Sequence, residues 1–280
     1  MKRARAAARP AAGARGARPP ALPLRVLRTT RVAVHVAEAL LKTALVMPWV
    51  GTPRRHRMIR GWSRRLLRLL RVDFRVHGLP EGGLPGNLLI VANHVSWLDI
   101  FVLNTLQPAR FVAKADLRRW PVVGWLIAGV GTLFIERDRR HDTHRVNRHV
   151  ADVLAGGDVI AVFPEGTTSD GRDLLPFHTS LLQPIVDAEG HVQPIAIRYR
   201  TPDGEHSDAP AYVGDTTFFE SFWRVIGERE LVVELHVAPP LSARARHRRE
   251  LSRAAEAAIR TALASPAAGS APGTPADRRA

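Results

Sequence analysis

Residues 88–99 read Leu-Leu-Ile-Val-Ala-Asn-His-Val-Ser-Trp-Leu-Asp. The five apolar residues at the start predict a short buried strand, and helix-like spacing resumes after Asn93 and His94. His94 is therefore expected where a strand passes into a helix, which is where open α/β sheets carry their chemistry. On one continuous helix His94 and Asp99 would point about 140° apart. They can meet only if His94 precedes the helix and Asp99 lies in its first turn.

Both residues also have a purely structural interpretation. Ser96 is suited to cap the helix, with Asp99 as the acidic third residue of a capping box. His94 would then be an ordinary polar loop residue. The motif alone leaves the choice between chemistry and local structure open.

The segments on either side of this stretch alternate between strand and helix patterns. The predicted strands span residues 72–76, 88–92, 111–113, 132–135, 158–163, 193–198 and 231–237, and the last of them alternates as if half-exposed. The helices predicted between and after these strands span residues 96–107, 120–128, 142–154 and 242–264. This alternation predicts an α/β fold with a mostly parallel sheet flanked by helices.

Two amphipathic helices are predicted ahead of the sheet. The first, residues 24–50, is mostly apolar but carries one polar stripe at intervals of three and four: Arg28, Arg31, His35, Glu38 and Lys42. Each central charge in a membrane-spanning helix costs about 2.5–3.5 kcal/mol. An interfacial helix with its apolar side in the lipid therefore fits better than a spanning one. The alternative is a soluble helix whose apolar face packs on the domain.

The second helix follows residues 51–53. One face is apolar, with Ile59, Trp62, Leu66, Leu69 and Leu70, and the other is basic, with Arg57, Arg60, Arg64, Arg68 and Arg71. Beside the first helix, this basic row indicates docking on an anionic membrane surface.

The composition narrows the possible partners and chemistry. Lysine and arginine outnumber acidic residues 41 to 26, which gives a formal net charge of +15 at pH 7. Such an excess indicates a polyanionic partner: a nucleic acid, an anionic membrane face or a phosphorylated substrate. The absence of cysteine excludes thiolate nucleophiles and cysteine-type metal sites.

Four predicted strands are each followed by a polar residue. His94, Lys114, Arg137 and Glu165 all come at such a strand end. Because the carboxyl ends of parallel strands lie along one edge of the sheet, these side chains are expected to form one site. After Glu165, the turn at residues 164–169 is expected to expose backbone N–H groups to an anion, although an ordinary surface turn is the alternative.

Four segments carry a resemblance to a known family. They are Asn93-His94-Val95-Ser96-Trp97-Leu98-Asp99, Gly131-Thr132-Leu133-Phe134-Ile135-Glu136-Arg137, Phe163-Pro164-Glu165-Gly166-Thr167-Thr168-Ser169 and Val192-Gln193-Pro194-Ile195. In this order the chain resembles the glycerolipid acyltransferases, specifically the bacterial lysophosphatidic acid acyltransferase group. The resemblance covers roughly residues 24–240 and implies the glycerolipid acyltransferase fold. We expect the acyltransferase domain at residues 72–264, preceded by the two amphipathic helices as a membrane-docking element at residues 23–71. Residues 1–22 and 265–280 are expected to be disordered tails.

The resemblance also implies roles for individual residues. His94 would be the general base and Asp99 its partner, with Arg137, Glu165 and Gly166 around a phosphorylated acceptor. We expect the acceptor site to include further residues of these segments and strand ends: Asn93, Ser96, Lys114 and Thr167.

The implied reaction moves a fatty acyl group from acyl-CoA or acyl carrier protein to the free hydroxyl of a lysophospholipid. The main expected acceptor is lysophosphatidic acid, which would give phosphatidic acid. Thr168 stands where the family commonly has arginine, and residues 177–179 replace a more basic segment. A lyso-aminolipid acceptor is therefore the alternative. No metal or other cofactor is expected beyond the acyl donor as co-substrate.

The residues present agree with this chemistry. A neutral imidazole can take the hydroxyl proton near neutral pH. The chain has no cysteine and no Gly-x-Ser-x-Gly motif, so direct attack within a ternary complex is simpler than a covalent route. The N–H donors for the developing oxyanion would come from the helix start after His94 or from the turn at Gly166.

Two other functions compete with this interpretation. The arginine excess also suits a nucleic-acid-binding protein, but we find no zinc-finger, RRM or P-loop pattern and expect no nucleic-acid partner. A catalytically inactive membrane adaptor would not need the intact pair His94 and Asp99. We therefore expect an enzyme associated with the cytoplasmic face of the inner membrane.

Overall fold

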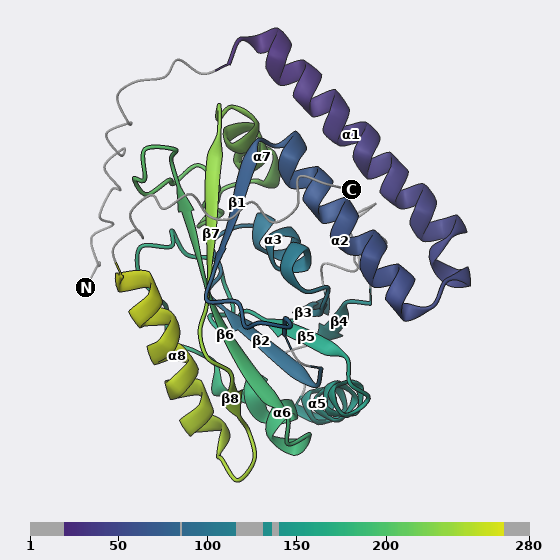
Figure 1. Cartoon of the computed structure of the whole chain (residues 1–280), viewed down its shortest axis with the longest axis vertical. Helices are drawn as coiled ribbons and strands as arrows, with labels where there is room; N and C mark the ends of the chain where they lie inside the picture. The colour runs from purple at the N-terminus through teal and green to yellow at the C-terminus, as the bar shows by residue number, and fades with distance from the viewer. Residues whose placement is uncertain (1–19, 85, 116–130, 136–139, 266–280) are drawn as a thin grey trace, which may run out of the picture.

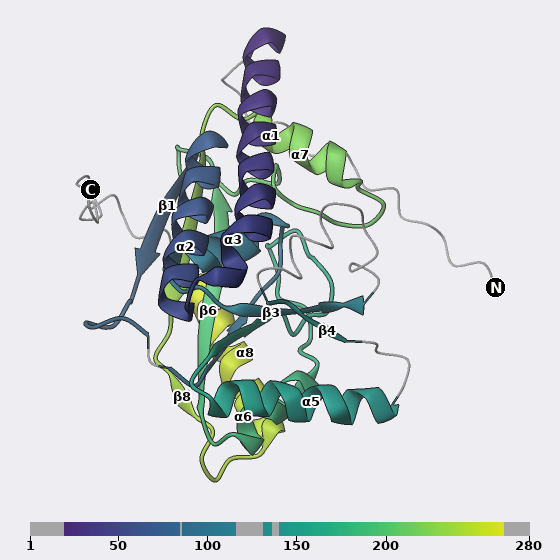
Figure 2. The same ribbon diagram turned by 90° about the vertical axis from the view of Figure 1, so that its right-hand side faces the viewer.

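One twisted sheet covered by helices on both faces makes up the body of the molecule (Figures 1 and 2). The computed structural model describes residues 20–84, 86–115, 131–135 and 140–265. The strands are β1 (Val72–His77), β2 (Leu88–Ala92), β3 (Arg110–Lys114), β4 (Leu133–Ile135), β5 (Val159–Val162), β6 (His191–Arg200), β7 (Leu231–Val237) and β8 (Leu241–Ser242). Their order is β1-β7-β6-β2-β5-β3-β4, and β8 pairs with β6.

Most pairs of neighbouring strands are parallel, as the sequence predicts. The exceptions are β7 and β8, which both run antiparallel to β6. Strand β2 lies between β5 and β6, with Leu88 paired to Val159 and to His191. All five β2 residues are fully buried because helices cover both faces of the sheet at this point. The strand that leads to His94 is thus central to the sheet.

Two hydrophobic clusters lie on opposite faces of the sheet. One cluster packs beneath α2 (Thr52–Leu69), α3 (Leu98–Leu106) and α7 (Phe218–Ile226); the other packs beneath α5 (Arg140–Ala155), α6 (Gln183–Asp187) and α8 (Arg248–Ala264). Successive residues of β2 alternate between the two, with Ile90 in the first and Val91 in the second, as the two-residue period of a strand requires. The remaining helical elements are α1 (Leu22–Leu45) and the 3₁₀ turns η1 (Met47–Trp49) and η3 (Thr179–Leu182).

The predicted strands and helices are largely confirmed, with four corrections. Helix α3 begins at Leu98 rather than at Ser96. Helix α8 begins at Arg248 rather than at residue 242, because Leu241 and Ser242 pair with β6. Strand β7 is buried rather than half-exposed, because Leu231, Val233 and Leu235 join the hydrophobic cluster on one face and Glu234 on the other face pairs with Arg200 of β6. Helices α6 and α7 were not predicted, and the helix predicted at residues 120–128 lies outside the described residues.

Helices α1 and α2 form the predicted amphipathic pair, but Arg28 and His35 of the polar stripe of α1 face the protein, whereas Arg31 and Lys42 are exposed. His35 is buried and stacks on Trp62 of α2, with 4.7 Å between ring centroids. The His35 Nε2 donates to the Trp62 carbonyl at 3.0 Å, and the Trp62 indole donates to the His35 carbonyl at 3.1 Å. Arg28 donates to two carbonyls near the end of α7, those of Ile226 and Glu228.

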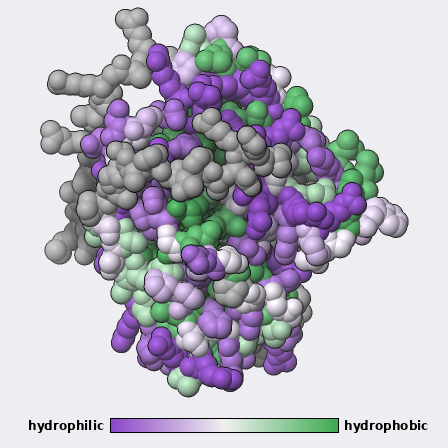
Figure 3. Space-filling view, viewed as in Figure 1, coloured by the Kyte–Doolittle hydropathy of each residue, from purple (hydrophilic) through white to green (hydrophobic). Residues whose placement is uncertain are grey.

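The apolar residues of α1 lie on the outside. Leu41 and Leu45 are about 60% exposed, and Trp49 in the turn after α1 is 85% exposed. Apolar side chains are accordingly visible along the α1 edge of the surface in Figure 3. Val32 and Ala39 of α1 are nevertheless buried, so the apolar residues of α1 are divided between packed and exposed positions. Within the part of the chain that the structure describes, we find no helix long and apolar enough to cross a membrane.

The basic row on α2 is only partly free. Arg60 is not on the exposed face, since it donates to the carbonyl of Leu106 and to the side chain of Gln107 at the end of α3. A guanidinium at a helix C-terminus satisfies carbonyls that have no partner within the helix. The other four arginines of the predicted row, Arg57, Arg64, Arg68 and Arg71, are exposed.

The buried His35 makes the contact between α1 and α2 sensitive to acid. Burial holds the pKa of His35 below its ordinary value of about 6.5. The unfolded chain therefore binds this proton first as the pH falls below about 6.5, and the free energy of unfolding falls with it. A His35→Phe variant keeps a ring against Trp62 but cannot titrate. Denaturant unfolding at pH 8 and pH 5.5 should show a larger loss of stability in wild type than in the variant. Equal losses would show that His35 does not contribute.

Candidate active site

The turn between β2 and α3 places His94 and Asp99 side by side. The His94 Nδ1 lies 2.8 Å from Asp99 Oδ2, and the imidazole stacks on Phe163 with 3.9 Å between ring centroids. The side chain of His94 is 21% exposed, whereas that of Asp99 is fully buried. Because Nδ1 is engaged by the carboxylate, Nε2 is the ring nitrogen left to meet a substrate.

The Asp99 carboxylate accepts four hydrogen bonds. Besides His94, its Oδ2 accepts from the backbone N–H groups of Val95 at 2.7 Å and Ser96 at 2.9 Å. Its Oδ1 accepts from the hydroxyl of Tyr199 at 2.7 Å. A buried carboxylate with this many donors is held in one orientation, and it holds the imidazole in turn.

Asp99 takes part in the turn before α3 as well as in the contact with His94. Its carboxylate accepts from the backbone of Ser96, which is one of the two bonds of the predicted capping box. The other bond is not formed, because the hydroxyl of Ser96 accepts from the backbone of Leu98 at 3.3 Å rather than from that of Asp99, and α3 begins at Leu98. The same carboxylate oxygen thus bonds both the turn before the helix and the His94 ring.

Tyr199 is a site residue that the sequence analysis missed. It lies on β6, a hundred residues along the chain from Asp99, and is buried. Burial, together with the charge and hydrogen bond of Asp99, raises the pKa of Tyr199 well above its ordinary value. Its phenol therefore stays protonated and remains a donor. The available signal for Tyr199 was the predicted strand at residues 193–198, which ends one residue before it.

Glu165 joins the two strand ends that form the site. It is buried after β5, where its Oε1 accepts from the backbone N–H of His94 at 2.7 Å and its Oε2 from that of Leu175 at 3.0 Å. Burial raises the pKa of Glu165 despite these two bonds. Both oxygens are thus occupied within the protein, so Glu165 positions the His94 backbone.

The turn after Glu165 packs against the same backbone. Gly166 adopts a φ of 71°, a left-handed conformation that glycine takes without strain, and its N–H donates to the Phe163 carbonyl at 3.1 Å. Ser169 donates from its backbone to the His94 carbonyl at 2.8 Å. Thr168 donates its hydroxyl to the carbonyl of Tyr212. The structure therefore brings His94, Asp99, Glu165 and Gly166 together.

The remaining predicted acceptor residues differ in their surroundings. Asn93 is buried and clamps β2 to β6, because its amide donates to the Ile197 carbonyl at 3.0 Å and accepts from the Ile197 N–H at 2.7 Å. Ser96 is also buried, with its hydroxyl used by Leu98. Both side chains are committed to positioning, so their predicted substrate contact stays a prediction.

Two of the other three predicted residues can be placed in the fold. Thr167 is exposed in the turn after Glu165, where a ligand can reach it. Lys114 is the last residue of β3, as predicted, and so lies at the carboxyl edge of the sheet. Arg137 lies outside the described residues.

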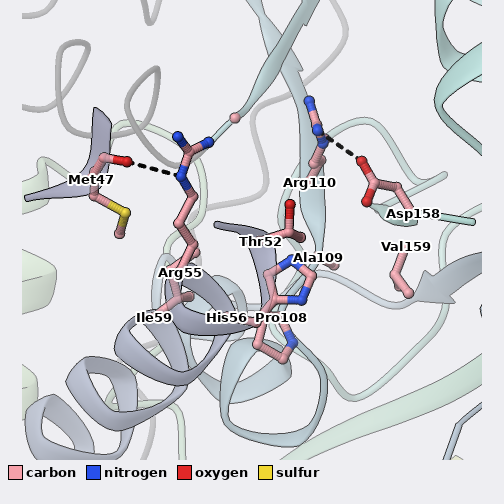
Figure 4. Close-up of a pocket in the computed structure, with 11 residues that line it drawn as sticks. Met47, Thr52, Arg55, His56, Ile59, Pro108, Ala109, Arg110, Asp158 and Val159 are labelled. Atoms are coloured by element: carbon pink, nitrogen blue, oxygen red, sulfur yellow. Dashed lines mark hydrogen bonds and ion pairs between the residues drawn. The ribbon is translucent and has the colours of Figure 1, made fainter. Parts of the chain in front are cut away.

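A cavity of about 240 Å³ lies away from this site (Figure 4). It is bounded by the start of α2 and by the residues at the amino ends of β3 and β5, whereas His94 follows the carboxyl end of β2. In its wall Arg110 pairs with Asp158 at 2.7 Å, and Arg55 donates to the carbonyl of Met47 at 2.9 Å. The cavity therefore does not contribute to the His94 site. Among the described residues, we find no cluster of three or more histidine or acidic side chains suited to a metal ion.

Comparison with known proteins agrees with this geometry. Residues 73–198 match the family model described as Acyltransferase. The chain is 38% identical over 213 residues to a lyso-ornithine lipid O-acyltransferase of Pseudomonas aeruginosa, covering 76% of this chain and 80% of that protein. It is 36% identical over 186 residues to a 1-acyl-sn-glycerol-3-phosphate acyltransferase of Neisseria gonorrhoeae, covering 66% and 72% respectively.

The fold has a solved counterpart as well. The crystal structure of the 1-acyl-sn-glycerophosphate acyltransferase PlsC from Thermotoga maritima superposes with a TM-score of 0.63, covering 86% of this chain and 94% of that one at 22% identity. The His94–Asp99 pair and the Glu165 turn thus lie within the matched part of the chain. The chain belongs to the acyltransferase family and is an enzyme that acylates a lysolipid.

Proposed function

We propose that this acyltransferase uses His94 as a general base to acylate the free hydroxyl of a lyso-aminolipid at the membrane surface. The observation that carries the chemistry is the contact between His94 Nδ1 and the buried Asp99 carboxylate. In the reaction, His94 Nε2 takes the hydroxyl proton while the hydroxyl oxygen attacks the thioester carbonyl of the donor. The carbon–sulfur bond then breaks, and the imidazolium returns its proton to the departing thiolate.

The carboxylate of Asp99 supports both halves of this proton transfer. It fixes the tautomer with the proton on Nδ1, so that Nε2 is free to accept the substrate proton, and it stabilises the imidazolium once formed. Phe163, stacked on the ring, limits rotation of the imidazole. The donor is a thioester of acyl-CoA or acyl carrier protein, the two sources that deliver an activated acyl group with a thiol leaving group.

The turn after Glu165 is better suited than the helix start to stabilise the oxyanion. The N–H groups of Val95 and Ser96 are already bonded to Asp99. Those of Thr167 and Thr168 have no partner among the residues that the structure describes. Preorganised N–H groups near a developing negative charge are an effective source of transition-state stabilisation.

Thr168 favours an acceptor with a weakly charged headgroup. It contributes a neutral hydroxyl, bonded to the Tyr212 carbonyl, at a position where the family that the sequence resembles commonly carries arginine. A dianionic phosphate would lose a bidentate partner there. The similarity to lyso-ornithine lipid acyltransferases, which extends over 86% of the chain in the Rhizobium meliloti protein, supports the same choice. Lysophosphatidic acid is the second candidate, supported by the Neisseria gonorrhoeae relative.

The outward apolar face of α1 supplies the contact with the bilayer. Its exposed leucines and Trp49 would enter the lipid interface, and the exposed arginines of α2 would meet anionic headgroups, each adding about 1 kcal/mol near the surface. We propose that the enzyme binds in this way to the cytoplasmic face of the inner membrane. The acceptor could then reach His94 without fully leaving the bilayer.

Replacing either member of the catalytic pair should remove activity from a folded protein. We expect His94→Ala and Asp99→Asn to lower kcat by at least about 10³-fold, the effect typical of a lost general base or its orienting partner. Asp73→Asn, on the exposed surface of β1, is the matched control. Turnover with lyso-lipid and acyl-CoA, measured together with Tm, checks the assignment. A folded variant with turnover near wild type would exclude the proposed base.

Tyr199→Phe should impair catalysis through Asp99 without changing the binding of either substrate. The change removes one hydrogen bond to a charged group, worth about 1.5–3 kcal/mol, and we expect kcat to fall about tenfold with both KM values retained. Without this donor, the negative charge of Asp99 is less stabilised and favours the imidazolium form of His94 more strongly. The acid limb of the kcat/KM profile should therefore move to higher pH.

The chain has one other tyrosine, so Tyr212→Phe is the control for Tyr199→Phe. A merely structural role would lower Tm and leave the acid limb in place. That result would remove Tyr199 from the catalytic network.

Thr168→Arg should shift the acceptor preference toward lysophosphatidic acid. A guanidinium at this position would pair with the phosphate, and we expect the ratio of kcat/KM for lysophosphatidic acid over lyso-ornithine lipid to rise about tenfold. Thr261→Arg, at an exposed position of α8 on the other face of the sheet, adds the same charge away from the site and serves as control. The wild-type enzyme should prefer lyso-ornithine lipid with both acyl donors. A wild-type preference for lysophosphatidic acid would overturn this choice of acceptor and leave the general-base mechanism intact.

A further inference from the structure

Helix α7 presents aromatic side chains to the outside of the molecule. Phe218 is 45% exposed and Phe219 is 67% exposed, although both are large apolar residues. Phe222 and Trp223 lie one turn further along and are half-buried behind them, with Phe218 stacked near Phe222 and Phe219 near Trp223. We refer to Phe218, Phe219, Phe222 and Trp223 as the α7 aromatic face.

The first turn of α7 is held in place despite its exposure. The Thr217 hydroxyl accepts from the backbone of Glu220 at 3.2 Å, and the Glu220 carboxylate accepts from the backbone of Thr217 at 2.7 Å. This capping box fixes the helix start. Phe218 and Phe219, the first two helical residues, are therefore presented on ordered backbone.

The α7 aromatic face is continuous with the outer side of α1. Arg25 of α1 lies over the Trp223 ring at 5.1 Å, and Arg28 bonds to the carbonyls of Ile226 and Glu228. Figures 1 and 2 both show α7 beside the N-terminal half of α1. In that half Leu24 and Leu27 are exposed by more than 40%. The polar contacts between the two helices thus leave apolar side chains of both exposed.

The same face reaches the catalytic segment. The Trp97 indole, which lies between His94 and Asp99 in the sequence, donates to the Ser221 hydroxyl at 3.1 Å. Its ring lies 5.2 Å from Phe218 and 6.3 Å from Phe222. The segment before α7 is attached as well, because the Tyr212 N–H donates to the Val95 carbonyl at 3.0 Å. A surface that contacts the α7 aromatic face therefore lies next to the His94 site.

We propose that the α7 aromatic face is a second lipid contact, which rests on the bilayer and delivers the lyso-lipid to His94. This inference rests on the proposed function, because it assumes a membrane lipid as acceptor. Large aromatic residues flanked by arginines are suited to an anionic membrane interface. A protein partner is less suitable, since two partly exposed phenylalanines supply far less than the roughly 800 Å² per partner of a stable protein interface.

Replacing the two exposed rings by glutamine tests the proposal. Phe218→Gln/Phe219→Gln introduces a good helix former at both positions and leaves the exposed apolar residues of α1 unchanged. Leu79→Gln is the matched control, since Leu79 is 45% exposed in the loop after β1, at the sheet edge opposite His94. Binding is measured by flotation with phosphatidylglycerol–phosphatidylcholine vesicles. Acyl transfer is measured with the same lyso-lipid in those vesicles and in detergent micelles.

We expect the double variant to bind vesicles about tenfold more weakly than the control and to lose a similar factor in rate on vesicle-borne lyso-lipid. Its rate in detergent should stay within about twofold of wild type, and Phe218→Trp/Phe219→Trp should bind as wild type does. Binding and vesicle rates equal to those of Leu79→Gln would overturn the proposal. So would a wild-type dimer, seen by light scattering without lipid, that dissociates in the glutamine variant. If wild type floats in a Phe-dependent way but transfers no acyl group in detergent, the proposed function fails and the lipid contact stands.

Discussion

The buried carboxylate of Asp99 is the group on which the site depends. A fully buried charge is tolerated only when its oxygens are supplied with donors, and here the donors come from two parts of the fold. The turn after β2 supplies the imidazole of His94 and two backbone N–H groups, and β6 supplies the phenol of Tyr199. Tyr199 can reach Asp99 only because β2 and β6 are adjacent. The full set of donors to Asp99 therefore depends on the sheet topology.

Asn93 and Glu165 extend this constraint to the neighbouring strands. Asn93 continues the pairing of β2 with β6 beyond the last β2 residue, by using its side-chain amide as a substitute for backbone groups. Glu165 makes the corresponding contact on the other side of β2, where it joins the end of β5 to the His94 backbone. The residues around His94 thus hold its backbone from both sides, and this rigidity is what a precisely placed base requires.

The sequence predicts local features of this site well and non-local ones poorly. The five-residue spacing of His94 and Asp99 and the capping-box pattern were sufficient to place the pair at a strand-to-helix turn. Tyr199 could not be found in this way, because only the pairing of β6 with β2 shows that a residue a hundred positions away meets Asp99. The buried state of β7 likewise depends on partners distant in the sequence, the hydrophobic cluster on one face and Arg200 of β6 on the other. Helix α7 did carry a local signal, because Thr217 and Glu220 have the spacing of a capping box. The apolar run after Thr217 is short, however, and was not assigned to a helix.

The orientation of α1 shows why an amphipathic pattern alone is ambiguous. A helix with one polar stripe can present that stripe to water or to polar groups of its own protein, and both arrangements give the same periodicity. Here carbonyls at the end of α7 and the ring of Trp62 supply partners for Arg28 and His35, so this part of the stripe faces the protein. Several apolar residues of α1, among them Leu41 and Leu45, then remain exposed. The contacts that attach α1 to α7 leave exposed apolar residues on both helices, and Phe218 of α7 lies 5.2 Å from the ring of Trp97, two residues before Asp99. The exposed apolar surface of α7 is therefore next to the turn that holds His94 and Asp99.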